Sequence, residues 1–155
     1  MKIQLIWIGK TKNRQLKELT DHYIERIRKF IDCSIIELKE QVHSRNTAVA
    51  QQKETRQIID RLQAKDGFKV SLSPDGRPFT SMEFSELFRR QRNSGTRLIH
   101  FILGSFIGLS KEIETVSDLQ MSISQMTLTH EMARLLLTEQ IYRAFTIING
   151  VPYQK

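Results

Sequence analysis

The sequence of 155 residues is poor in the residues that build covalent or metal-based sites. Its single cysteine, Cys33, excludes a disulfide framework and a cysteine-based metal site, so a buried free thiol is expected. The four histidines, at positions 22, 43, 100 and 130, are scattered, and no metal site is predicted. His100 lies in an apolar stretch, which favours a hydrogen-bonded core residue over a ligand.

Long apolar runs and nucleotide-binding glycine motifs are absent as well. No run approaches the roughly 20 residues that cross a bilayer, and no signal peptide precedes the first apolar segment. We therefore expect a cytoplasmic protein without a membrane partner. Gly104 and Gly108 are not followed by the Lys-Ser/Thr of a phosphate-binding loop, and their spacing does not fit the dinucleotide motif Gly-x-Gly-x-x-Gly.

The remaining composition, 39% hydrophobic and 26% charged, is typical of one soluble globular domain, here spanning 1–155. Apolar periodicity alternates between strand and helix along the chain, which predicts an α/β fold with a mostly parallel sheet and helices on both faces. Strands are expected at 2–8, 33–39, 68–72, 97–103 and 119–124, and helices at 14–31, 46–65, 81–92, 110–116 and 130–145. The segment 97–103 is the most apolar and is expected at the centre of the sheet.

Two local signals have defined chemistry. Ser73-Pro74-Asp75-Gly76 predicts a turn in which the glycine is able to take a positive φ. Thr80 stands three residues before Glu83, the spacing of a capping box at a helix start.

The formal charge is +7, and the first 31 residues hold eight basic residues against three acidic ones. A second basic cluster, Arg89-Arg90-Gln91-Arg92, ends a predicted helix. Such an excess suits a polyanion such as nucleic acid, because cations release counterions from phosphates. The alternative is a solvated basic surface whose cations complement helix C-termini.

The region after residue 122 pairs charged residues at helical spacing. His130 and Arg134 lie four residues apart, as do Glu139 and Arg143, so each pair shares a helix face. The plain interpretation of both is an exposed pair that contributes only about 0.3–0.5 kcal/mol.

Three stretches, "ILGSFIGLS", "ISQMTLTHEMARLLLTEQIYRAF" and the closing "PYQK", resemble the RlmH (YbeA-type) family of ribosomal RNA methyltransferases. The resemblance covers the whole chain, including "KIQLIWIGK" and "SLSPDGRPFTSMEFS". It implies a SPOUT fold whose C-terminal segment forms a deep trefoil knot, a homodimer, and S-adenosylmethionine as methyl donor. The implied substrate is N3 of a pseudouridine in a hairpin of 23S ribosomal RNA.

The resemblance also assigns a cofactor site to three loops. It implies contacts from Leu72, from Gly104, and from the run Ile123-Ser124-Gln125-Met126-Thr127-Leu128. A glycine at 104 lets the backbone approach a ligand closely, and the main chain of the run could read the adenine edge. Leu72, Ile123 and Met126 would form apolar walls, although plain core packing is the alternative for Leu72 and Ile123.

Catalytic work falls on Arg143 and the tail, at an active site that the resemblance implies is completed across the dimer. Tyr153, Gln154 and Lys155 are the tail candidates. Family tails usually read Pro-Tyr-His-basic, and Gln154 cannot titrate, although it could hydrogen-bond the base. This departure leaves open a catalytically weak RNA-binding relative. A small nucleotide-binding protein unrelated to RNA is disfavoured by the missing phosphate-loop motifs.

Two further departures lie close to the implied cofactor site. Ser105 replaces the second glycine of a usual Gly-Gly pair and is expected to bring a hydroxyl near the ligand. Glu131 adds a negative charge at a predicted helix N-terminus, where the helix dipole favours it.

Overall fold

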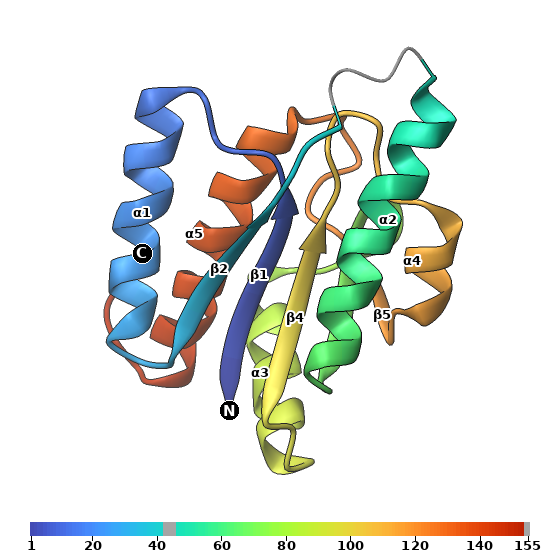
Figure 1. Cartoon of the computed structure of the whole chain (residues 1–155). Coiled ribbons are helices and arrows are strands. Elements are labelled where there is room, and N and C mark those ends of the chain that lie inside the picture. The colour runs from blue at the N-terminus through green and yellow to red at the C-terminus, as the bar shows by residue number, and fades with distance from the viewer. Residues whose placement is uncertain (42–45, 154–155) are drawn as a thin grey trace.

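Five parallel strands form one sheet in the order β2-β1-β4-β3-β5, with helices against both faces (Figure 1). The structure is a computed structural model, and it describes residues 1–41 and 46–153. The strands are β1 (Lys2–Ile8), β2 (Cys33–Leu38), β3 (Phe68–Pro78), β4 (Leu98–Leu103) and β5 (Leu119–Ser122). The helices are α1 (Arg14–Arg28), α2 (Thr47–Ala64), α3 (Ser81–Asn93), α4 (Lys111–Val116) and α5 (His130–Ile148). The predicted α/β class is confirmed, and β4 is the middle strand, as its apolar sequence indicates.

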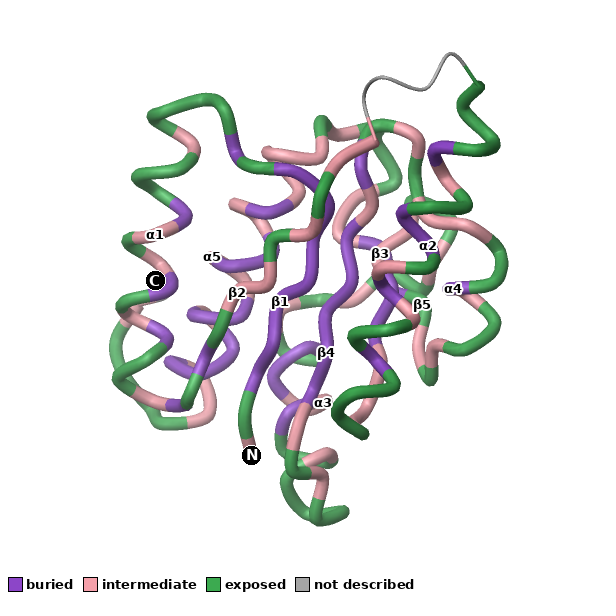
Figure 2. The backbone as a smooth tube through the Cα atoms, in the orientation of Figure 1, coloured by how far each residue is buried: buried purple, intermediate pink, exposed green. Residues whose placement is uncertain are grey.

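Alternating side chains of the central strands supply two separate cores. Ile3, Leu5 and Trp7 of β1 join a large core with α1, α3 and α5. Ile6 and Ile8 point to the other face and pack with α2 and α4. Figure 2 shows the buried backbone concentrated in β1 and β4, between these two layers.

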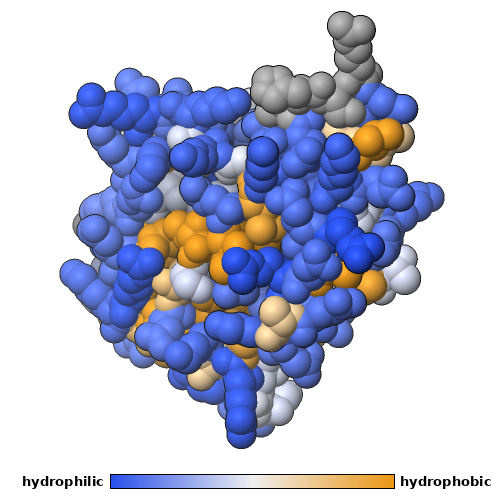
Figure 3. Space-filling view, in the orientation of Figure 1, coloured by the Kyte–Doolittle hydropathy of each residue, from blue (hydrophilic) through white to orange (hydrophobic). Residues whose placement is uncertain are grey.

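The edge strand β2 is less covered than the centre of the sheet. Its Ile35, Ile36 and Leu38 are only half-buried. Figure 3 shows apolar surface over this part of the molecule, surrounded by polar side chains. An edge strand that lacks a full helical cover leaves its apolar residues partly in contact with water.

Helix starts follow the predicted capping chemistry. The Thr80 side chain accepts a hydrogen bond from Glu83 N, and the Glu83 carboxylate accepts one from Thr80 N, so the capping box is confirmed. Thr129 caps α5 in the simpler manner, by accepting from Met132 N. The helix then runs to Ile148, three residues beyond the predicted end.

The predicted turn at residues 73–76 is wrong in kind. β3 continues through Pro78, and its pairing with β5 shifts register between Leu72 and Arg77, so these residues form an irregularity within a strand. The positive-φ glycines are at 9, 95, 108 and 150, not at Gly76. A Cβ at Gly76 would stand 2.6 Å from the Met121 carbonyl carbon. Gly76 therefore provides close strand approach rather than a turn conformation.

Two buried groups match their predicted roles. Cys33 is a buried free thiol, and burial raises its pKa to about 12. His100 is fully buried in β4, with Nε2 3.0 Å from the Lys65 carbonyl oxygen. Both are core residues, as expected.

The order and pairing of the strands do not test the predicted knot or the predicted single domain. The trefoil knot depends on how the C-terminal segment threads the chain, and it stays a prediction, as does the single domain over 1–155. Among the described helices, none is long and apolar enough to cross a membrane.

Candidate functional site

A pocket of about 120 Å³ opens at the carboxyl edge of the sheet, where the ends of β4 and β5 and an irregular part of β3 meet the first turn of α5. This edge is where open α/β sheets bind ligands. Its lining consists of Leu72, Ser73, Pro74, Leu103, Gly104, Ile123, Ser124, Leu128, His130 and Ala133. Five of the eight residues assigned to the cofactor by resemblance are therefore brought together: Leu72, Gly104, Ile123, Ser124 and Leu128.

The other three assigned residues, Gln125, Met126 and Thr127, lie outside this pocket. All three are exposed, and Met126 has 78% of its surface accessible. The loop that carries them turns back on itself: Ser122 donates its hydroxyl to Ser124 O, and Ser124 Oγ accepts from Met126 N at 3.0 Å. The Met126 side chain consequently forms no wall of the pocket in this conformation.

Gly104 occupies a position with no room for a side chain. A Cβ there would stand 2.7 Å from the Gly108 carbonyl carbon and 2.9 Å from Leu109 N, because the loop folds back on itself. Gly108 closes this fold with φ of 82° and an N–H that donates to Ser105 O at 3.0 Å. The glycine expected for close ligand approach is thus also required by the loop itself.

Ser105 does not place its hydroxyl in the pocket. The side chain is buried and donates to the Glu54 carboxylate of α2 at 2.8 Å. Glu54, 3% exposed, also accepts from Gln41 N at 3.1 Å. The expectation of a ligand-facing hydroxyl is therefore not met, and Ser105 fastens its loop to α2 instead.

The predicted exposed pair of His130 and Arg134 is wrong. Arg134 is fully buried, and its guanidinium donates to Thr11 Oγ1 at 3.0 Å and to Ile8 O. It also lies 5.1 Å from the centre of the Trp7 ring. Helical spacing reveals neighbours on the same helix, whereas these partners are more than 120 residues away.

His130 is instead a pocket residue. Burial, and then the nearby Arg134 charge, lower its pKa below the usual value, so the neutral imidazole is favoured. Sequence reasoning noticed His130 but gave it no role. The sequence feature that indicates a pocket role for His130 is its position at the start of a helix that follows a strand. It stands three residues before the pocket residue Ala133.

Arg143 and Tyr153 belong to a different cluster, towards the far end of α5. The Arg143 guanidinium donates to Glu139 Oε1 at 2.9 Å through Nε and lies 4.8 Å from the centre of the Tyr153 ring. Tyr153 donates to the same Glu139 oxygen at 3.2 Å, and its hydroxyl lies 3.2 Å from that of Tyr23 in α1. The pair of Glu139 and Arg143 is thus half-buried within a network, which corrects the predicted exposed pair.

The pKa values in this cluster follow from those contacts. Burial, the hydrogen bond with Tyr23 and the Glu139 charge raise the pKa of Tyr153 well above 10. The hydrogen bond with Glu139 raises the pKa of Arg143. Tyr153 therefore remains a neutral phenol that can donate a hydrogen bond.

The pocket and the tail cluster lie apart along α5. Glu139 and Arg143 lie nine and thirteen residues beyond His130, which is about 14 to 20 Å along the helix at 1.5 Å per residue. Tyr153, the last described residue, lies against α1, with its hydroxyl 3.2 Å from that of Tyr23. Gln154 and Lys155 lie outside the described residues.

No group of three or more His, Cys, Asp or Glu side chains that could hold a metal occurs among the described residues. The chemistry available at the pocket is therefore that of apolar walls, two serines, a neutral imidazole and main-chain groups.

Comparison with known proteins identifies the family. A model described as a predicted SPOUT methyltransferase matches residues 1–154. The chain belongs to this family. Among relatives, the "Ribosomal RNA large subunit methyltransferase H" of Streptococcus pyogenes is 38% identical over 160 residues, covering 100% of both chains. The protein of that name from Christiangramia forsetii is 36% identical over 155 residues, covering 99% of this chain and 98% of its own.

Solved structures share the fold of this chain. A probable methyltransferase from Bordetella pertussis superposes with a TM-score of 0.56 at 15% identity, covering 92% of this chain and 95% of its own. A putative methylase from Neisseria gonorrhoeae gives the same TM-score at 11% identity, with 99% and 95% covered.

Proposed function

We propose that this SPOUT methyltransferase transfers a methyl group from S-adenosylmethionine to N3 of a pseudouridine in a hairpin of 23S ribosomal RNA. The carrying observation is the pocket: five residues assigned to the cofactor, from three separate segments, line one cavity at the carboxyl edge. Full-length relatives named as methyltransferases of large-subunit ribosomal RNA support the substrate class. With the ribosome as its proposed partner, the protein is expected to act in the cytoplasm.

The residues present suit the adenosyl end of the cofactor. Leu72, Leu103 and Ile123 offer apolar walls, and Ser124 and main-chain groups offer polar contacts, which is the usual make-up of a small-ligand site. The pocket volume is below the roughly 300–1,000 Å³ typical of ligand sites. The enclosed part therefore suits the adenine ring rather than the whole cofactor, and the exposed residues 125–127 are well placed to cover the remainder.

S-adenosylmethionine supplies a methyl group on a sulfonium, which is already a strong electrophile. The protein must then align N3 with that methyl group and favour loss of the N3 proton. When bound, S-adenosylmethionine would give up its methyl group with S-adenosylhomocysteine as the leaving group, and the imide proton would pass to solvent. Arg143 favours the anionic base by its charge, and the Tyr153 ring, 4.8 Å from the Arg143 guanidinium, orients that charge.

We infer a homodimer in which the partner's tail completes each site. The separation between the tail cluster and the pocket of the same chain supports this arrangement. Half-buried Leu135 and Leu136 on α5, and Leu19 on α1, which is 48% exposed, offer apolar surface for such contact. A two-fold dimer would contain two equal composite sites.

Mass spectrometry of 23S ribosomal RNA from a deletion strain tests the activity. The expected result is the loss of one methylpseudouridine, restored by a plasmid copy. Calorimetry with S-adenosylmethionine tests the cofactor independently. Cofactor binding with an unchanged RNA would contradict the enzyme and favour the catalytically weak RNA-binding relative.

A further inference from the structure

The loop between β1 and α1, residues 9–13, lies next to the pocket at the same edge of the sheet. β1 pairs with β4 in a register that places Trp7 opposite Leu103, so the chain leaves β1 beside the start of the Gly104 loop. Neighbouring strands are about 4.8 Å apart. Gly9 makes the exit possible with φ of 81°, and its N–H donates to Leu38 O at 2.8 Å.

This loop is fastened to the first turn of α5 by two side chains. Arg134, fully buried, donates to Ile8 O and Thr11 Oγ1. The Glu131 carboxylate accepts from Lys12 N at 2.6 Å and from Asn13 N at 3.2 Å. Although burial opposes it, these two backbone hydrogen bonds lower the pKa of Glu131, which therefore stays ionised. The same turn of α5 carries His130 and Ala133, so the loop and the pocket share one support.

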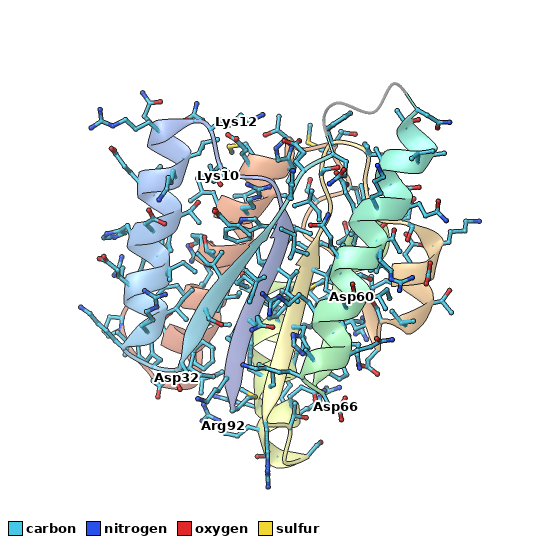
Figure 4. All side chains as sticks on the ribbon, in the orientation of Figure 1. Lys10, Lys12, Asp32, Asp60, Asp66 and Arg92 are labelled. Atoms are coloured by element: carbon cyan, nitrogen blue, oxygen red, sulfur yellow. The ribbon has the colours of Figure 1, made fainter. Side chains whose placement is uncertain are left out.

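The loop presents two ammonium groups on this support. Lys10 and Lys12 are exposed, and Figure 4 shows them at the upper edge of the molecule, the edge at which the strands end. Among the described residues, Lys10 forms no ion pair. Lys12 lies 3.5 Å from Glu40, but 75% of its side chain is accessible, so that contact is weak. The α1 N-terminus, which begins after Asn13, adds positive potential to the same place.

We propose that residues 9–13 form an RNA-backbone contact, in which Lys10 and Lys12 bind phosphates next to the nucleotide that enters the pocket. The proposal rests on the proposed function and specifies which surface receives the RNA. A fastened loop favours binding of a polyanion because its backbone loses little freedom when the two lysines contact phosphates. Glu131 then acts as a positioning residue, because its carboxylate accepts hydrogen bonds from the loop backbone and does not face the phosphates.

The opposite edge of the sheet is a poorer candidate despite its cations. Lys2, Arg28, Lys65 and Arg97 line a larger hollow there, together with Asp32 and Asp66. Lys2 is paired with Asp32 at 3.1 Å, and Arg28 donates to Cys33 O at 3.0 Å, so two of these four cations already have partners. Figure 4 shows Asp32, Asp66 and Arg92 at this lower edge. α1, α2 and α3 all end there, so their dipoles offset part of the positive charge.

The first test compares matched charge removals at the two edges. The double variant Lys10→Gln with Lys12→Gln is set against Lys29→Gln with Lys65→Gln at the lower edge. Binding of a labelled 20-nucleotide RNA is measured by fluorescence anisotropy from 50 to 200 mM salt. The loop variant should bind roughly tenfold more weakly. The slope of log K against log salt concentration should become less steep by about 0.7 to 0.9 for each lysine removed.

The lower-edge variant should keep both its affinity and its salt slope, and calorimetric affinity for S-adenosylmethionine should be unchanged in both. Equal losses from the two variants, or no loss from the loop variant, would overturn the proposal. Methyl transfer to ribosomes by the wild type is the separate readout of the proposed function. If the wild type methylates ribosomes but the loop variant binds RNA as well as the wild type does, the loop assignment is wrong and the proposed function stands.

A second test asks whether replacing Glu131 raises or lowers the affinity for RNA. Removing the negative charge of Glu131 would strengthen RNA binding if charge alone mattered, whereas loss of its loop contacts should weaken it. We expect Glu131→Gln to bind the 20-nucleotide RNA more weakly than the wild type. The control Glu18→Gln, which removes an exposed carboxylate of α1, should bind as well or better. Tighter binding by Glu131→Gln than by Glu18→Gln would overturn the positioning role.

Discussion

The two ends of α5 differ in what they leave open. At its N-terminal end, the helix borders a hollow with apolar walls and few polar groups. Near its C-terminal end, Glu139, Arg143 and Tyr153 satisfy one another in a filled network. One end is shaped to receive a ligand, and the other holds a tail. Under the proposed function, a single chain therefore holds both parts of the site without assembling them.

The largest expected effect is the loss of cofactor binding when a side chain is added at the pocket end of α5. Gly104→Val should weaken S-adenosylmethionine binding by about a hundredfold or more, because any Cβ there collides with the backbone of residues 108 and 109. Isothermal calorimetry measures the affinity, and circular dichroism checks the fold. Gly95→Ala is the matched control, since Gly95 has φ of 77° but open space around it and lies away from the pocket. Unchanged affinity in Gly104→Val would remove this loop from the cofactor site.

A mixed dimer asks directly whether the two ends meet across subunits. Gly104→Val and Tyr153→Ala chains are co-expressed with different tags, and methyl transfer to ribosomes is measured. Random pairing gives heterodimers as half of the dimers, each with one intact composite site, so about a quarter of wild-type activity should return. Each homodimer alone is the control. No recovery in the mixture would place pocket and tail of the same chain in one site.

The tail end should affect turnover rather than cofactor binding. Tyr153→Ala removes the hydroxyl and the ring that Arg143 stacks on, so kcat should fall by roughly a hundredfold through lost alignment. The Kd for S-adenosylmethionine should be unchanged. Tyr153→Phe keeps the ring and should lose less activity. An undiminished kcat in Tyr153→Ala would exclude the tail from the mechanism.

Local patterns predicted the elements of this fold well, because the information lay within each segment. The apolar run at 97–103 indicated the central strand, and Thr80 with Glu83 indicated a capping box. The turn expected around Gly76 was wrong because its residue types suit both a turn and a strand irregularity. Only the neighbouring backbone of Met121 decides between these two.

The site was less predictable because its key contacts join distant segments. Arg134 reads as a surface residue from its helical spacing, yet it is buried against Ile8 and Thr11. Ser105 reads as a ligand contact from its place beside Gly104, yet Glu54 of α2 takes its hydroxyl. Family resemblance supplied the pocket loops, and nothing in the sequence indicated which of their residues would face outward.

The support beneath the pocket should give a moderate effect on stability. Ser105→Ala leaves the buried Glu54 carboxylate without one of its donors, which should cost about 1 to 3 kcal/mol of unfolding free energy. Urea denaturation measures the change. Ser94→Ala, at an exposed serine that bonds Arg90 O, should change stability by less than about 0.5 kcal/mol. Equal effects from the two variants would contradict the role of Ser105 in fastening its loop.

The smallest effect should be a pH dependence of opposite sign at the two ends. The folded pKa of His130 is lowered by burial and by Arg134, so its contribution to stability is full above pH 6.5 and is lost as the pH falls through the lower folded value. The folded pKa of Tyr153 is raised by burial, so its contribution is full below pH 10 and is lost as the pH rises through the higher folded value.

Melting temperatures of the ligand-free protein between pH 5 and 11 test both limbs. His130→Asn should make the acid limb shallower without removing it, because burial also lowers the pKa of His100. Tyr153→Phe should make the alkaline limb shallower without removing it, because burial also raises the pKa of Cys33, and it should leave the acid limb unchanged. If either variant altered the opposite limb, the two ends of α5 would be coupled within one subunit. The separation along the helix would then no longer require a second copy of the chain to unite them.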